Sequence, residues 1–138
     1  MIPKSCILEI DEPRINAIYL ELRSKIDVHE APNAAAVMSR VFFEMSVDHY
    51  LATFKIKPAN EHLKSKAAAV RDDMKAKGVD KDVLSPLNHA LSNQGAQFAI
   101  DLLHMYVHHR RFAPIPTDLI TSWDNMQPFF EALWELVK

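Results

Sequence analysis

The chain has 138 residues, of which 49% are hydrophobic and 25% are charged, and its net charge is -2. This length suits one domain with a single core, and the composition excludes intrinsic disorder as the main state. The nearly balanced charge excludes a uniformly basic surface, so RNA or DNA could be bound only through a local patch.

The first half of the chain predicts two helices. Asp11 is expected to cap the first one, with Pro13 in its opening turn, where the missing N–H costs nothing. A second, longer helix is expected over Asn33–Phe54, and its apolar residues surround most of its circumference. We therefore expect this segment to be the central helix of the fold. The apolar stripe of the first helix is Ile15, Ile18, Leu22 and Ile26.

Two further helical segments are expected in the middle of the chain. The first runs to Lys77 and is closed by Gly78, with a thin apolar stripe between many lysines. A short helix or turn follows between Asp80 and Leu91, where Asp80 and Ser85 with Pro86 look like successive starts. The thin stripe consists of Leu63, Ala67, Val70 and Met74.

The C-terminal part predicts a helix over Gln97–His109 and a last helix capped by Thr117. Pro128 lies inside the last helix and is expected to kink it near Asp124. Its apolar residues alternate by fours and threes, which is typical of a bundle: Leu119, Trp123, Met126, Phe130, Leu133 and Val137.

These elements predict an all-α fold, a bundle of five to six mostly antiparallel helices that forms one domain over residues 1–138. The chain has only Gly78 and Gly95 as glycines, fewer than a β-rich domain would need for its turns. Cys6 is the only cysteine, so an intrachain disulfide and a zinc site of several thiolates are excluded. Without an apolar run of about 20 residues or a secretion peptide, we expect a cytoplasmic protein without membrane contact.

The strongest candidate site is a polar stripe on the helix over Gln97–His109. Asp101, His104 and His108 follow offsets of three and four, which place them on one helix face. Two histidines and a carboxylate at this spacing could bind a divalent metal, but a polar stripe explains them better. We therefore expect no metal and no cofactor.

Arg40, Glu44 and Asp48 form a second charged line on the central helix. If the central helix is buried, these charges should pair with one another or with the histidine stripe. The alternative is that they form the one solvated edge of this helix and have no function of their own. If they are functional, the two lines share one binding groove: Arg40, Glu44, Asp48, Asp101, His104 and His108.

Phe129 and Trp134 lie off the main apolar face of the last helix. Large aromatic side chains left over from the core are candidates for a homodimer interface. Packing under the N-terminal segment is an equally good explanation for these two residues.

Two stretches carry a family resemblance: residues 36–51, and residues 103–109 followed by Pro114, Pro116 and residues 123–130. Together they resemble a helical domain of the HEPN superfamily (higher eukaryote and prokaryote nucleotide-binding). This domain occurs in bacterial proteins, often as a C-terminal module behind a ParB-like nuclease module or in phage-defence genes. The resemblance leaves open that the chain is one domain of a longer protein.

The resemblance implies a helical bundle that dimerises and, in many members, cleaves RNA without a metal. Nuclease members place an arginine a few residues before a histidine, and His108 matches that histidine. Positions 101 to 103, where the arginine would stand, hold Asp101, Leu102 and Leu103 instead. Arg23 and His29 meet the spacing, but at the end of the first helix.

The sequence therefore predicts a non-catalytic, HEPN-like module that forms a homodimer and acts within a nucleic-acid-processing or phage-defence system, with a protein partner or a covalently linked domain. The alternatives are a metal-independent ribonuclease and a nucleotide-sensing domain. In the ribonuclease, His108 would be the general acid or base, and Arg110 or Arg111 would stabilise the developing charge.

Overall fold

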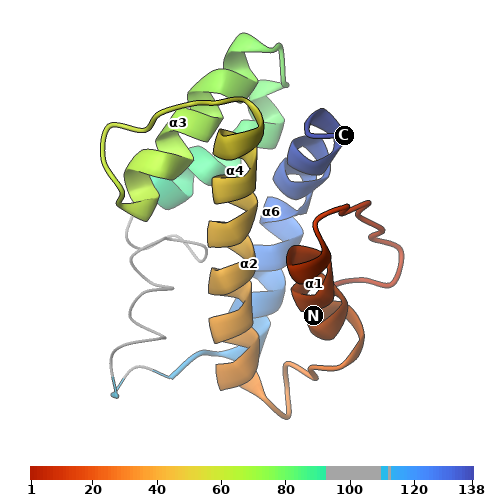
Figure 1. The fold of residues 1–138 in the computed structure, drawn as a ribbon. Helices are drawn as coiled ribbons and strands as arrows, with labels where there is room; N and C mark the ends of the chain where they lie inside the picture. Colours follow the sequence, from red (N-terminus) through yellow and green to blue (C-terminus); the bar gives the residue numbers. More distant parts are fainter. Residues whose placement is uncertain (93–109, 112) are drawn as a thin grey trace.

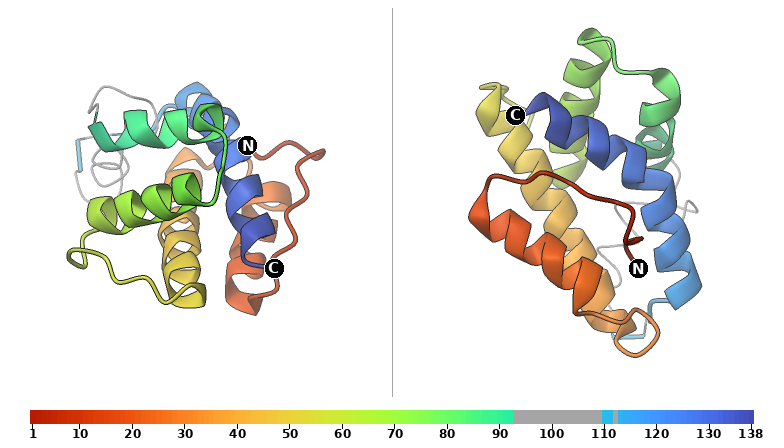
Figure 2. Two further views of the ribbon diagram at one scale, coloured as in Figure 1. Left: turned by 90° about the horizontal axis from the view of Figure 1, so that it is seen from above. Right: turned by 90° about the vertical axis from the view of Figure 1, so that its right-hand side faces the viewer.

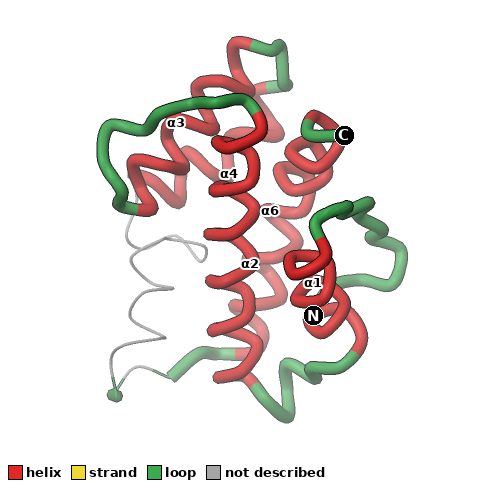
Figure 3. The backbone as a smooth tube through the Cα atoms, viewed as in Figure 1, coloured by secondary structure: helices red, strands yellow, loops and turns green. Residues whose placement is uncertain are grey.

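The computed structural model of this chain describes residues 1–92, 110, 111 and 113–138. Over these residues the protein is all-helical and contains no strand (Figures 1 and 3). The helices are α1 (Pro13–Ser24), α2 (Pro32–Thr53), α3 (Leu63–Ala76), α4 (Lys81–Ser92) and α6 (Pro116–Leu136). This confirms the predicted all-α fold, whereas the helix predicted over Gln97–His109 lies outside the described residues.

The long helix α2 is the centre of the fold, as predicted, and it packs against α1, α3 and α6. Figures 1 and 2 show that α1 and α2 run antiparallel, as α3 and α4 do, whereas α2 and α6 run in the same direction. The helices α3 and α4 form a hairpin whose second arm packs on α6. The sequential pairs α1–α2 and α3–α4 are therefore antiparallel, whereas the non-sequential pair at the core is parallel.

Aromatic rings fill the contact between α2 and α6. The ring centroids of Phe42 and Phe130 lie 4.9 Å apart, and Trp123 stacks on Phe130 at 5.1 Å. All three side chains are buried, and such ring pairs add to the burial of apolar area. The predicted apolar face of the last helix is confirmed along its whole length, because all of its predicted positions are buried: Leu119, Trp123, Met126, Phe130, Leu133 and Val137.

Two predicted helix caps are wrong. The side chain of Glu12, not Asp11, caps α1, because its Oε2 accepts a hydrogen bond of 2.7 Å from the Ile15 amide. Thr117 lies inside α6, whose N-cap is Ile115 without any side-chain hydrogen bond. In both helices a proline occupies one of the first positions and places the cap directly before itself.

The predicted effect of the proline inside the helix is wrong for Pro86 and agrees with the structure for Pro128. Pro86 does not divide its region into two starts, because α4 continues through it from Lys81 to Ser92. Pro128 lies within α6, and the right view of Figure 2 shows the darker C-terminal part of α6 running at an angle to the lighter N-terminal part. The change of direction agrees with the expected kink, because a proline ring clashes with the carbonyl one turn earlier.

The expected dimer residues belong to the core. Phe129 and Trp134 are only 0% and 1% exposed, and the ring of Trp134 stacks on His49 at 5.2 Å. Their side chains are thus covered by the chain itself, which corrects the prediction that they form a homodimer interface. Phe129 packs against Phe43 of α2, with 6.3 Å between the ring centroids. The N-terminal segment, residues 2–10, buries Ile2, Cys6, Leu8 and Ile10 in the same core, and its residues 7–9 line a shallow pocket together with Trp134.

Candidate functional site

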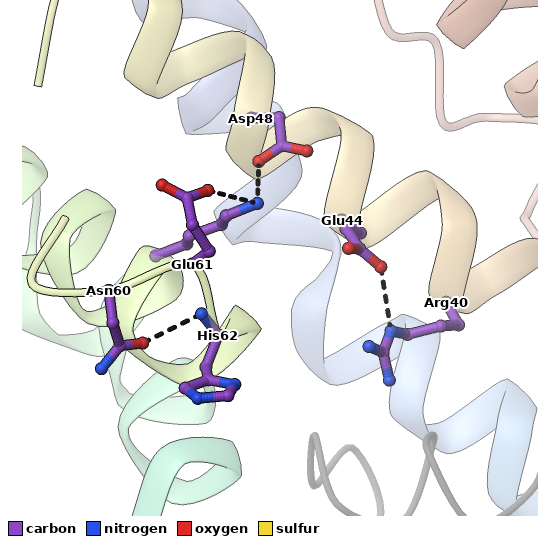
Figure 4. Close-up of polar contacts among 7 residues, drawn as sticks. Arg40, Glu44, Asp48, Asn60, Glu61 and His62 are labelled. Carbon is purple, nitrogen blue, oxygen red and sulfur yellow. Dashed lines mark hydrogen bonds and ion pairs between the residues drawn. The ribbon is translucent and has the colours of Figure 1, made fainter. Parts of the chain in front are cut away.

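The charged line of α2 divides into two ion pairs that differ in partner. Arg40 Nε lies 3.4 Å from Glu44 Oε2, one helical turn further along α2. Asp48 instead approaches Lys66 of α3, with 3.0 Å between Asp48 Oδ1 and Lys66 Nζ. Figure 4 shows these pairs along the helix. The expected internal pairing is therefore confirmed for Arg40 and Glu44, but Asp48 links two helices.

Lys66 is the residue that organises this side of the bundle. Its side chain is only 13% exposed, and its ammonium also lies 3.6 Å from Glu61 Oε2, just before α3. The hydrogen bond with Asp48 raises the pKa of Lys66 above its usual range, although partial burial opposes this change. The ammonium is therefore stabilised in its charged form, and it is suited to hold α2 and α3 together.

The binding groove proposed from the sequence is only partly described. Arg40, Glu44 and Asp48 lie along one side of α2, while Asp101, His104 and His108 lie outside the described residues. Of the candidates after His108, Arg110 and Arg111 are both exposed. The shared groove therefore stays a prediction, and the part of it on α2 carries charges that already have partners.

A second polar cluster joins the C-terminal ends of α2 and α3, and sequence reasoning missed it. The Tyr50 hydroxyl donates a 2.7 Å hydrogen bond to Asp73 Oδ2, and Lys77 Nζ lies 2.6 Å from the same oxygen. The Lys77 ammonium also lies 3.0 Å from the centre of the Phe54 ring, a cation–π contact. The four-residue spacing of Asp73 and Lys77 on a helix was the available signal.

The environment of this cluster shifts two acid groups in opposite directions. Burial raises the pKa of the Tyr50 phenol well above its usual value, and the adjacent Asp73 carboxylate raises it further. Partial burial raises the pKa of Asp73, but hydrogen bonds from Lys77 and Tyr50 and the charge of Lys77 outweigh this, so its pKa is lowered overall. At neutral pH the cluster thus contains a neutral phenol and a charged carboxylate, as expected for a structural contact.

Arg23 and His29, which meet the arginine-to-histidine spacing of the nuclease members, line one pocket. Its volume is about 400 Å³, and it lies where α1 ends and the loop to α2 begins. Arg23 also donates from its guanidinium to the Lys4 carbonyl in the N-terminal segment, and its buried Nε has no hydrogen-bond partner among the described residues. Arg23 and His29, which meet the expected spacing in the sequence, therefore also lie at the same pocket in the fold.

Two further properties concern the described residues alone. Within them, no group of three or more His, Cys, Asp or Glu side chains is arranged to hold a metal ion. None of the helices in this part of the chain has the length and the apolar character needed to cross a membrane.

Comparisons with known proteins returned no match among family models, curated proteins or solved structures.

Proposed function

We propose that this chain is a non-catalytic, HEPN-like helical module that forms a homodimer and acts through partner contacts in a bacterial nucleic-acid-processing or phage-defence system. Its place of action would be the cytoplasm. The partner would be another protein or a covalently linked domain, and RNA or DNA would be contacted only through a local patch.

The observation that supports a non-catalytic role is the pairing of the charges on the central helix. Arg40 pairs with Glu44 within α2, and Asp48 pairs with Lys66 of α3. A general acid or base needs access to substrate and a pKa matched to proton transfer. Charged groups that are already held in ion pairs are better suited to stabilise a binding surface than to transfer protons.

A metal-independent ribonuclease is the second candidate, because Arg23 and His29 line the same pocket. In this reading His29 would accept the proton of a ribose 2′-hydroxyl as that oxygen attacks the adjacent phosphorus. The 5′-oxygen would leave with a proton from a general acid, and the Arg23 guanidinium would stabilise the charge on the phosphoryl oxygens. His108 with Arg110 or Arg111 could do the same work in the arrangement expected from the sequence.

One assay separates the two candidates. The purified chain is incubated with single-stranded and with structured RNA in the presence of a chelator, alongside the variants His29→Ala and His108→Ala. The proposed module leaves both RNAs intact. Cleavage by the unmodified chain that disappears in one of the two variants would replace the proposal with the ribonuclease and would identify its histidine.

A matched variant controls for effects on folding. His62→Ala changes an exposed histidine in the loop before α3, whose backbone amide, not its ring, bonds to Asn60 Oδ1 at 2.9 Å. If this variant lost cleavage as fully as His29→Ala, the loss could not be assigned to the pocket at the end of α1.

A further inference from the structure

A hollow of about 260 Å³ lies in the hairpin formed by α3 and α4. The left view of Figure 2 shows the two helices side by side, joined by the turn that follows α3. The hollow is lined by the C-terminal half of α3, the turn and the first two-thirds of α4. Its lining residues are Arg71, Asp72, Lys75, Val79, Lys81, Leu84 and Asn88.

The lining of this hollow is cationic. Arg71 and Lys75 come from α3, Lys81 comes from α4, and Asp72 is the one carboxylate among the lining residues. Lys75 and Lys81 form no ion pair or hydrogen bond through their side chains with the described residues, so their charges are not neutralised locally. This concentration of positive charge is confined to the side chains that line the hollow, because Asp80 and Asp82 flank Lys81 in the sequence but are not among the lining residues.

The guanidinium of Arg71 is fixed in place over the hollow. Its Nε donates to Asp72 Oδ1 at 3.1 Å, and its Nη2 lies 3.1 Å from the same oxygen. Its Nη1 donates to Asn88 Oδ1 of α4 at 3.3 Å. A guanidinium has five N–H donors in one plane, so donors remain for a ligand after these bonds are made. A donor that is already oriented loses less conformational entropy when an anion binds.

The size and the other lining residues of the hollow limit the kinds of ligand that it can bind. The volume suits a compact group more than a nucleoside, and the lining contains no aromatic ring on which a base could stack. The amino end of α4 does not provide the site, because Asp80 Oδ1 already accepts from the Asp82 amide at 2.7 Å. Val79 and the buried Leu84 supply an apolar wall, which strengthens charge interactions by excluding water.

We infer that this hollow is a binding site for a phosphate or pyrophosphate group, held by the side chains of Arg71, Lys75 and Lys81. The group is either a free anion or the terminal phosphates of a larger ligand. Recognition depends on charge and on the fork of the Arg71 guanidinium, which matches two phosphoryl oxygens. The inference does not depend on the proposed function, since it concerns another part of the molecule.

Isothermal titration of the full chain with inorganic pyrophosphate at low ionic strength tests the site. We expect saturable binding with a Kd below about 1 mM, weakened about tenfold or more in the double variant Lys75→Gln/Lys81→Gln. Asp72→Asn should act in the opposite direction and tighten binding several-fold, because it removes the carboxylate from the lining. A parallel titration with ADP separates the sources: equal affinity indicates the phosphate group alone, and tighter binding of ADP indicates a nucleotide.

The controls change the same charge elsewhere. Arg14→Gln/Lys57→Gln removes two exposed cations outside the hairpin, and Asp124→Asn removes an exposed carboxylate from α6. Pyrophosphate affinity should stay within about twofold in both, and circular dichroism should show that every variant unfolds at a similar temperature. The site is rejected if pyrophosphate does not bind saturably, or if the control pair weakens binding as much as the hairpin pair.

Discussion

Tyr19 links the N-terminal segment to α1 through a single hydroxyl group. The hydroxyl donates to the Cys6 carbonyl at 2.7 Å and accepts from the Leu8 amide at 3.2 Å, and the side chain is buried. Buried backbone groups that lose their partner cost more than the bond itself contributes, because their desolvation is no longer compensated. The hydroxyl therefore holds a segment that has no regular secondary structure of its own.

Tyr19→Phe should consequently lower the free energy of unfolding by about 1–3 kcal/mol, because the Cys6 carbonyl and the Leu8 amide become unsatisfied. Urea unfolding followed by circular dichroism measures the change. Leu20→Ala, an exposed position on the same helix, serves as the control and should stay within about 0.5 kcal/mol. Equal effects of the two substitutions would contradict the assigned role of the hydroxyl.

The lowered pKa of Asp73 makes the contact between α2 and α3 sensitive to acid. A carboxyl group whose pKa is lower in the folded state stabilises the fold above its unfolded-state pKa, near 3.8 for this group. That stabilisation is lost as the pH falls through the lowered value of the folded state. At pH values below about 4, the free energy of unfolding should therefore decrease, in part because Asp73 becomes protonated.

Asp73→Asn should remove this part of the acid sensitivity. We expect the variant to be about 1–2 kcal/mol less stable than the unmodified chain at pH 7, with a smaller difference at pH 3. Urea titrations at the two pH values measure it, with the exposed Asp72→Asn as control. A difference between Asp73→Asn and the unmodified chain that is the same at both pH values would contradict the assignment.

Residue roles were the hardest to predict from the sequence. The charges at Arg40 and Glu44 could be paired from their spacing, but Lys66 as the partner of Asp48 could not, because that contact joins different helices. The caps of α1 and α6 were misplaced because the cap position depends on local backbone geometry at each proline. The roles of Asp101, His104 and His108 stay predictions.

At the scale of elements, the periodicity of apolar residues was informative. The predicted stripe of α3 is buried at every position: Leu63, Ala67, Val70 and Met74. The closing glycine of that helix was also predicted correctly, since Gly78 has a φ of +86°, which strains other residues. Periodicity failed for Phe129 and Trp134 because these rings pack on Phe43 and His49 of α2, beside the main apolar face of α6. In the N-terminal segment the buried Cys6, Leu8 and Ile10 alternate with exposed neighbours, but Ile7 is apolar, so the sequence alone did not show this alternation.

Phe129→Ala distinguishes a core residue from an interface residue. Because its side chain is fully buried within the chain, we expect a loss of about 3–5 kcal/mol in the free energy of unfolding, independent of protein concentration. An interface residue would instead affect stability in a concentration-dependent way. Ile7→Ala is the matched control, because Ile7 is 74% exposed, and its effect should be within about 0.5 kcal/mol.

At the scale of the whole molecule, composition and periodicity were sufficient to predict an all-α fold and to place α2 at its centre. They could not identify a surface for assembly, because a contact between two copies leaves no periodic pattern in the sequence. With Phe129 and Trp134 in the core, a homodimer must use other surfaces, and exposed apolar side chains such as Val37 and Ile115 are available.

Homodimer formation by a non-catalytic module is the central claim, and sedimentation equilibrium of the full chain over micromolar to millimolar concentrations tests it most directly. The single chain has a mass of 15.8 kDa. We predict that the average mass rises with concentration and levels off at about twice that value. A mass that remains at 15.8 kDa at the highest concentration would contradict the claim.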